Sequence, residues 1–349
     1  MQRIEAQSPS AQRAYELVNA LQQQLVKRME LISQAAGTNS AFEPVEWFRA
    51  EGRHGGGVRY VANDEAVFNR GSVNVSQVQY EDDDMKSLGS ATALSSIIHP
   101  RNPLAPSVHL HVSWTELKNG QGYWRIMADL NPAIESPDAT AQFRRCLEEA
   151  APEQFAEAEA QGNRYFFIPA LDRHRGVCHF YLENYHTADA SADIQLAERV
   201  ISRIIDTYAD ILSQAIDNNP MPKQDDFKQQ LAYHTLYFLQ VLTLDRGTTS
   251  GLLIHDQNDI GILGSLPAQV DKALLESWLP NMTEPQDELL KRLIAYTPDA
   301  QGELGGSKID TTVKQSLAIE IRQHYQKHPE ALDLQASANT VPPTVANHQ

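Results

Sequence analysis

Hydrophobic and polar residues alternate most regularly between residues 107 and 130 of the chain. Every second residue of segment 107–114 is hydrophobic, which is the period of a strand with one buried face. The polar residues between them are Ser107, His109, His111 and Ser113. The alternation returns in residues 123–130, after an Asn-Gly pair that is typical of a tight hairpin turn. We therefore predict an antiparallel hairpin with one hydrophobic face and one face of polar and titratable side chains.

The position of the turn predicts which residues of this hairpin face each other. If the turn is centred near Asn119, His109 lies opposite Asp129. Ser113 then lies opposite Arg125. A carboxylate beside an imidazole orients the ring and favours its protonated form, which suits proton transfer. The alternative is a polar edge that faces solvent, and the alternation by itself fits both interpretations.

Other segments show either a helical period or short hydrophobic runs. Hydrophobic residues three or four positions apart predict helices over residues 10–35, 138–161, 191–218, 269–278, 287–296 and 313–328. Short hydrophobic runs predict strands over residues 165–168, 176–182 and 235–244, and a hairpin of residues 251–254 with 260–263. Residues 42–49 are expected to form a short connecting element, and residues 52–57 a glycine-rich loop.

Hairpins with helices before and after them favour an α+β fold. The chain has 349 residues without internal repeats or an obvious linker, so we expect residues 1–328 to form a single domain. From Pro329 onward the sequence is polar and contains proline, which predicts a disordered tail over residues 329–349.

The composition narrows the classes of partner and compartment. A formal net charge of −16 disfavours binding to nucleic acid or to anionic membranes. The N-terminus lacks the apolar core of a signal peptide, and no apolar run reaches the length of a membrane span. The only cysteines, Cys146 and Cys178, are too few for a disulfide framework. We therefore expect a cytoplasmic protein without nucleic-acid or membrane partners.

Several short motifs follow one another between residues 47 and 267. Around the predicted hairpin they are Ser-x-x-x-His-Pro-x-Asn-Pro at residues 95–103, Pro-x-x-His at residues 106–109 and Ala-Asp-Leu-x-Pro at residues 128–132. Elsewhere they are Gly-Gly-Gly-Val-Arg at residues 55–59, Ser-Val-Asn-Val-Ser at 72–76, Arg-Gly-Val at 175–177, Asp-Arg-Gly-Thr at 245–248 and Ser-Leu-Pro at 265–267. In this order they resemble the oxygen-dependent coproporphyrinogen III oxidase family.

The resemblance implies a homodimeric enzyme built around a large, flat, mainly antiparallel sheet with helices on both faces. Its implied reaction uses molecular oxygen to decarboxylate two propionates of coproporphyrinogen III to vinyl groups, which gives protoporphyrinogen IX for haem synthesis. By resemblance His109 is the proton donor, Asp129 engages the pyrrole N–H groups, and Ser95 contacts the substrate. Further substrate contacts are expected from Asn102, His111, Ser113, Arg125 and Arg175. No cofactor beyond oxygen as co-substrate is expected, and the alternative is a divalent metal bound by His99.

The chain departs from the family pattern mainly around this site. The family's Asn-x-Arg after the proton-donor histidine is replaced by His111 and Ser113, and its later Gly-Gly-Arg by residues 256–259. Glycines of the family are replaced by Arg125, Met127 and His179, which predicts a narrower pocket. Each missing arginine removes a charge-assisted bond to a carboxylate, worth roughly 1.5–3 kcal/mol. The arginines that remain as candidate replacements are Arg125, which is predicted opposite Ser113, and Arg59, Arg101 and Arg175.

These departures leave three alternatives open. One is a divergent enzyme that acts on a smaller pyrrolic substrate. Another is a non-catalytic protein that binds a porphyrin. The third is a metal site, because His109 and His111 have the spacing of metal ligands on a strand.

Overall fold

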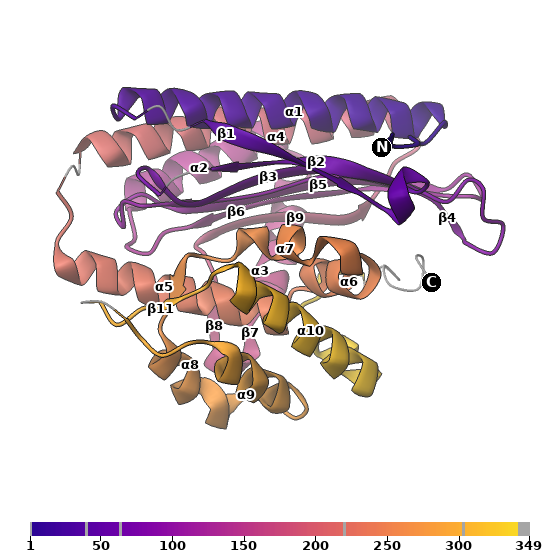
Figure 1. Ribbon diagram of the computed structural model, residues 1–349. Coiled ribbons are helices and arrows are strands. Elements are labelled where there is room, and N and C mark those ends of the chain that lie inside the picture. The colour runs from indigo at the N-terminus through magenta and orange to yellow at the C-terminus, as the bar shows by residue number, and fades with distance from the viewer. Residues whose placement is uncertain (1, 39–40, 63–64, 219–220, 302–303, 341–349) are drawn as a thin grey trace.

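The computed structural model describes residues 2–38, 41–62, 65–218, 221–301 and 304–340. Its centre is a seven-stranded sheet in the order β1-β2-β3-β4-β5-β6-β9, in which every neighbouring pair is antiparallel. The strands are β1 (Phe42–Phe48), β2 (Gly55–Ala62), β3 (Phe68–Gln79), β4 (Leu88–Pro100), β5 (Ser107–Leu117), β6 (Gly122–Asn131) and β9 (Cys178–Tyr185). Helices cover both faces of the sheet (Figure 1), which confirms the predicted α+β fold.

The two helical layers differ in origin along the chain. Helices α1 and α4 lie along one face of the sheet with α2 beside them, whereas α5–α10 form the layer on the other face (Figure 1). Helix α3 packs along the edge strand β9. The helices are α1 (Pro9–Ala35), α2 (Pro137–Ala150), α3 (Phe155–Tyr165), α4 (Ala190–Asn218), α5 (Gln224–Thr243), α6 (Arg246–Ile254), α7 (Asp259–Ile262), α8 (Lys272–Trp278), α9 (Gln286–Tyr296) and α10 (Thr311–Lys327). Two short ladders are formed by β7 (Phe167–Ile168) with β8 (Arg173–His174) and by β10 (Gln269–Val270) with β11 (Ser307–Lys308).

The long helices follow the hydrophobic pattern of the sequence. Helix α1 begins after Ser8, whose Oγ accepts a hydrogen bond from the Ala11 amide at 3.0 Å. The hydrophobic sides of α1 and α4 are buried together against the sheet, where they form the larger hydrophobic core. The helices predicted over residues 10–35 and 191–218 are confirmed. No helix in the part of the chain that the structure describes is both long and apolar enough to cross a membrane.

The hairpin of β5 and β6 has the predicted register. His109 pairs with Asp129, and Ser113 pairs with Arg125. The hydrophobic residues of the hairpin point into the core beneath α1 and α4; these are Val108, Leu110, Val112, Ile126, Ala128 and Leu130. Because side chains of a strand alternate between its two faces, the polar residues point toward the layer of α5–α10.

One predicted strand is wrong: residues 235–244 belong to helix α5. Every residue from Tyr233 to Thr243 is buried, mostly in a second hydrophobic core that α5 shares with α6 and α8–α10. A helix that is buried on all sides has no polar face, so its sequence lacks an amphipathic period. A buried hydrophobic run of this kind cannot be told from a buried strand by its periodicity.

The hairpin predicted from residues 251–254 and 260–263 is also wrong. These residues lie in helices α6 and α7 and in the turn that follows. Helix α6 begins after Asp245, whose Oδ2 accepts a hydrogen bond from the Thr248 amide at 2.7 Å. The capping residue was visible in the sequence, but hydrophobic runs of four residues are too short to separate strand from helix.

Four smaller predictions are corrected as well. Residues 42–49 contain the edge strand β1, and the glycine-rich loop ends at Gly55, where β2 begins. The helix predicted over residues 138–161 is two helices, α2 and α3, and Pro152 lies between them, where it cannot continue a helical hydrogen-bond pattern. Residues 165–168 comprise the last residue of α3 and the short strand β7 rather than a longer strand.

The segment after α10 is ordered as far as the structure describes it. Pro329–Leu334 forms the 3-10 helix η6, in which Ala331 is fully buried. The Nε2 of Gln335 donates hydrogen bonds to Thr249 Oγ1 at 2.6 Å and to Tyr325 Oη at 3.0 Å. The prediction of a disordered tail is therefore wrong for residues 329–335, and residues 341–349 lie outside the described residues.

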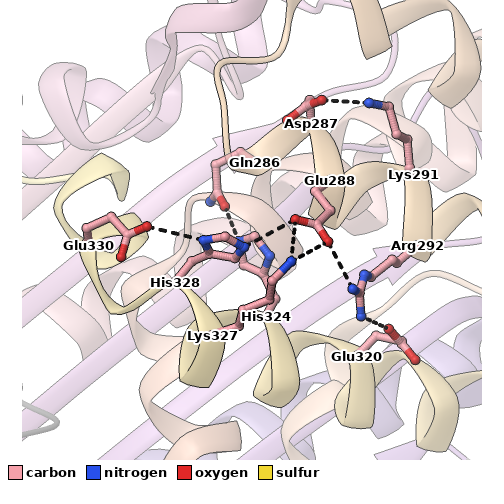
Figure 2. A network of polar contacts seen from close by, with 10 residues as sticks. All are labelled: Gln286, Asp287, Glu288, Lys291, Arg292, Glu320, His324, Lys327, His328 and Glu330. Atoms are coloured by element: carbon pink, nitrogen blue, oxygen red, sulfur yellow. Dashed lines mark hydrogen bonds and ion pairs between the residues drawn. The ribbon is translucent and has the colours of Figure 1, made fainter.

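A polar network also holds η6 against α9 and α10, as Figure 2 shows. Glu288 of α9 pairs with Lys327 at 2.9 Å and with His328 at 3.2 Å. His328 in turn lies 3.2 Å from Glu330 of η6. Because most of these side chains are partly exposed, each pair by itself contributes little to the stability of the fold. Together the pairs orient the end of α10.

Candidate active site

A cavity of about 300 Å³ lies between the sheet and helices α5–α7. Strands β3–β6 form its floor, and the helices form its roof. The residues predicted for the site that line this cavity are Ser95, His109, His111, Ser113 and Arg125. The polar face of the hairpin is therefore the floor of a partly open cavity and not a free edge of the sheet.

The floor on β3 and β4 is made of short side chains. They are Ser72, Asn74, Ser76, Ala91, Ala93 and Ser95. These residues take every second position of their strands, so they share the face of the sheet that is turned to the cavity. Short side chains on neighbouring strands leave a broad, shallow surface, which suits a flat ligand better than a compact one.

His109 and Asp129 form a pair in the cavity floor. Asp129 Oδ1 lies 3.3 Å from His109 Nδ1, and Asp129 Oδ2 accepts hydrogen bonds from Arg175 at 2.7 Å and from Asn131 Nδ2 at 2.6 Å. Burial raises the pKa of Asp129, but Arg175, His109 and Asn131 together outweigh it and hold the pKa below its ordinary value. His109 lines the cavity, whereas Asp129 is fully buried behind it. The negative charge of Asp129 therefore acts on the cavity through His109.

His111 connects two hydroxyl groups of the floor. Its Nδ1 lies 2.8 Å from Ser95 Oγ and its Nε2 lies 3.1 Å from Ser113 Oγ. Burial, followed by repulsion from Arg125 and His109, holds the pKa of His111 well below its ordinary value. A neutral imidazole donates at one nitrogen and accepts at the other, so this chain offers both donors and acceptors to a ligand.

Arg125 reaches the cavity wall from β6 and is held by Glu183 of β9. Arg125 Nε donates to Glu183 Oε1 at 2.7 Å, and Arg246 donates to Glu183 Oε2 at 2.9 Å. Two guanidinium groups thus share one carboxylate. Within the described residues the terminal nitrogens of Arg125 make no hydrogen bond, so they are available to an anion in the cavity.

Glu183 is a site residue that the sequence analysis missed. Its signal is the alternation along β9, where Cys178, Phe180 and Leu182 point into the hydrophobic core. Tyr181, at one of the intervening positions, lines the cavity and donates a hydrogen bond to Glu183. The alternation was shorter than that of the hairpin and had no turn signal to place it in register.

Apart from Asp129, three of the predicted site residues do not line the cavity. Arg175 is fully buried behind Asp129, between the rings of Phe166 and Tyr237. Asn102 lies in the loop after β4, where its Oδ1 accepts a hydrogen bond from the Leu104 amide at 3.0 Å. Arg175 therefore supports the His109–Asp129 pair, and Asn102 supports a turn.

His99, the predicted metal ligand, is the third of these residues. It is fully buried, with Nδ1 2.8 Å from Ser107 Oγ and its ring packed edge-on against Tyr237. Burial, followed by repulsion from His234 and Arg175, holds the pKa of His99 well below its ordinary value. Among the described residues, no group of three or more His, Cys, Asp or Glu side chains has an arrangement that could hold a metal ion.

Neither residue that replaces the family's Gly-Gly pair after Arg175 narrows the cavity. His179 lies outside it, with Nδ1 2.8 Å from Asn163 Oδ1 and Nε2 2.8 Å from the Arg175 carbonyl. Cys178 points into the opposite core, and burial raises the pKa of its thiol to about 12. The prediction that His179 narrows the pocket is wrong, whereas Arg125 and Met127 do line it.

The cavity thus brings the His109–Asp129 pair close to the guanidinium of Arg125. The family model described as coproporphyrinogen III oxidase matches residues 13–295, and the chain belongs to this family. The chain is 28% identical over 251 residues to the mitochondrial oxygen-dependent coproporphyrinogen-III oxidase of Rattus norvegicus, covering 65% of this chain and 56% of that protein. The chain is 26% identical over 277 residues to the Homo sapiens protein of the same name, and this match covers 72% of this chain and 60% of that protein.

Bacterial relatives are similarly distant. The oxygen-dependent coproporphyrinogen-III oxidase of Rickettsia bellii (strain OSU 85-389) is 27% identical over 239 residues, which cover 64% of this chain and 82% of that protein. The match spans little more than half the length of the mammalian relatives. The resemblance to this family that the motifs indicated is confirmed, and the chain is a divergent member.

Proposed function

We propose that this protein uses molecular oxygen to decarboxylate coproporphyrinogen III to protoporphyrinogen IX. The observation that supports this most directly is His109, which faces the cavity while the buried Asp129 holds its ring. Membership of the family supports the class of substrate. The broad floor of β3 and β4 supports a substrate that is flat.

The reaction needs a proton in the cavity. Each propionate, one oxygen molecule and one proton give a vinyl group, carbon dioxide and hydrogen peroxide, and two such steps convert the substrate. A C–H bond on the propionate carbon next to the pyrrole ring breaks, and its two electrons and its hydrogen pass to oxygen. The bond to the carboxyl carbon also breaks, and its electron pair forms the C=C bond of the vinyl group. We assign the proton to His109, whose ring faces the cavity beside the carboxylate of Asp129. Asp129 is then a positioning residue, because it is fully buried and reaches the substrate only through His109.

The remaining floor residues are proposed to bind the substrate. Arg125 offers a guanidinium group to a propionate beside Ser113, which restores the positive charge that the family carries on the neighbouring strand. Ser95 and His111 offer hydroxyl and imidazole groups to the polar edges of the pyrrole rings. We propose oxygen as the only co-substrate, without a further cofactor, and a homodimer as the assembly; both rest on the family resemblance.

A smaller pyrrolic substrate is the second candidate. It is favoured by Arg125 and Met127, which occupy the cavity where the family has glycines. A non-catalytic porphyrin-binding protein is the third, and it differs from the other two in predicting binding without turnover.

The test is aerobic incubation of the purified protein with coproporphyrinogen III, with released carbon dioxide and the fluorescence of the oxidised product as readouts. We expect turnover by the wild type and a loss of about 100-fold or more in His109→Gln, the scale of a lost proton-transfer group. The exposed His186→Gln is the matched control and should retain full activity. Tight binding without turnover would favour the binding protein, and turnover of a smaller pyrrolic acid alone would favour the second candidate.

A further inference from the structure

A row of residues crosses the sheet from β2 to β6 through the cavity floor. The strand register places Arg59 beside Asn74, Asn74 beside Ser95, Ser95 beside His111 and His111 beside Met127. Cross-strand partners share a face of the sheet, so Arg59 belongs to the same face as the four residues that line the cavity. With neighbouring strands about 4.8 Å apart, the backbones of β2 and β6 are separated by about 19 Å along this row.

Arg59 is a buried cation without an acidic partner. Its side chain belongs to a residue that is only 7% exposed, and it forms no hydrogen bond or ion pair within the described residues. Nη1 in particular is buried and has no acceptor. A buried guanidinium without a partner is unfavourable, because the lost hydration is not replaced. Such a group in a folded protein indicates a ligand that supplies the missing negative charge.

The surroundings place this guanidinium at the β2 end of the cavity. A Cβ on Gly261, a cavity residue of α7, would lie 2.0 Å from Arg59 Nη1 and 2.1 Å from Asn258 Oδ1. A Cβ on Gly264 would lie 3.6 Å from Arg59 Cδ and 3.4 Å from Ser72 Oγ. The lack of side chains at these two positions therefore lets Arg59 lie against the segment of α7 and the turn after it, and beside Gly261 the guanidinium and the Asn258 amide fill the space that a side chain would take.

A second buried cation lies close to Arg59. Lys314 of α10 is 7% exposed, and its ammonium forms no hydrogen bond or ion pair in the part of the chain that the structure describes. Burial, followed by repulsion from Arg70 and Arg59, lowers the pKa of Lys314 to about 7. Arg70 is paired with Glu65 at 3.2 Å. Arg59 and Lys314 are thus two neighbouring cations for which the described residues supply no acidic partner, although the chain as a whole is acidic.

We propose that Arg59, supported by Lys314, binds one carboxylate of the substrate at the β2 end of the cavity, while Arg125 binds a second at the β6 end. The site then selects flat molecules that carry carboxylates on opposite edges. The inference rests on the proposed function and makes it more specific, since a single pyrrole ring cannot reach both ends. A macrocycle with propionates around its rim reaches both.

The probes are coproporphyrin III, which has carboxylates around the ring, and mesoporphyrin IX, which has them on one edge only. Fluorescence titration should show the wild type binding coproporphyrin III about tenfold or more tightly than mesoporphyrin IX. In Arg59→Met the affinity for coproporphyrin III should fall about 10- to 100-fold and the preference should disappear. Arg59→Lys should retain part of the affinity. Exposed Arg13→Met is the matched control and should bind as the wild type does.

Arg59→Met is expected to fold, because it removes an unpaired buried charge, and circular dichroism checks this. Unchanged coproporphyrin III affinity in Arg59→Met would overturn the role of Arg59 while leaving the proposed function intact. If the wild type binds no porphyrin, the proposed function fails. The small polycarboxylate mellitate then tests separately whether Arg59 and Lys314 bind a carboxylate. If mellitate raises the thermal unfolding midpoint of the wild type but not of Arg59→Met, the result would support carboxylate binding by Arg59. Equal shifts, or no shift in either protein, would overturn it.

Discussion

Buried charges and their partners determine the chemistry of single residues in this site. Asp129 is matched by Arg175, and Glu183 is shared by Arg125 and Arg246. These partners are 46 to 63 positions apart in the chain. Residue types alone therefore indicated which groups are titratable, but not which of them are paired.

The pairing of Asp129 with Arg175 predicts a non-additive effect on stability. Asp129→Asn leaves Arg175 buried without a counter-charge, so the free energy of unfolding should fall by about 3–5 kcal/mol. The double variant Asp129→Asn/Arg175→Met should lose less than the sum of the two single losses. Urea unfolding measures all three, and the exposed Glu198→Gln should stay within about 0.5 kcal/mol of the wild type. If the two losses were additive, Asp129 and Arg175 would not stabilise each other.

Lys314 predicts a stability that depends on pH. The pKa of this lysine is about 7 in the folded protein and ordinarily 10.5, so between these values the unfolded chain binds more protons. The stability of the wild type should therefore rise with pH in this window, by up to about 1.4 kcal/mol per pH unit from this group. Lys314→Met should stabilise the protein most below pH 7, and the gain should shrink toward pH 10. Urea unfolding at pH 6, 7.5 and 9 measures the gain. An arginine stays charged in the folded and the unfolded state, so the stability of Lys314→Arg should not rise with pH as that of the wild type does, and this variant should become less stable than the wild type toward pH 9.

Secondary structure elements were predictable where each has one buried and one polar face. The alternation and the Asn-Gly turn placed the β5–β6 hairpin in register, and the helical period placed α1 and α4. Helix α5 was misassigned because it is buried on every side. The two small helices α6 and α7 were misassigned because their hydrophobic runs are short.

Strand β2 depends on glycine at a position where it meets strand β1. Gly56 has φ +149°, and a Cβ there would lie 2.2 Å from the Trp47 carbonyl oxygen. That oxygen belongs to the neighbouring strand and moves only if the β1–β2 pairing is disturbed. Gly56→Ala should therefore lower the free energy of unfolding by about 1–3 kcal/mol more than Gly120→Ala does. Gly120 also has a positive φ, +84°, but nothing lies within 4 Å of its Cβ position, so equal costs in urea unfolding would show that only backbone strain matters.

At the scale of the whole molecule, the two helical layers cover opposite faces of the sheet, and each has a different structural role. Helices α1 and α4 bury the hydrophobic face of the sheet, while α5–α7 cover the cavity on the opposite face. The first layer comes from the start and middle of the chain, and the second from its last third (Figure 1). A ligand between sheet and roof contacts both parts, so binding and the packing of the helical roof are expected to be coupled.

The sequence by itself determined what is local or periodic. It specified the polar face of the hairpin, the pairing of His109 with Asp129, the long amphipathic helices and the motifs that mark the family. These features depend on neighbours within one strand, one helix or one tight turn, whose geometry is the same in any fold.

Only the tertiary structure decided which charges remain unpaired. It placed Arg175 behind Asp129 and gave Arg125 a partner in Glu183. Among the residues that the structure describes, it left Arg59 and Lys314 without an acidic partner. Burial and charge compensation depend on segments that meet through folding, and no spacing along the chain encodes that meeting.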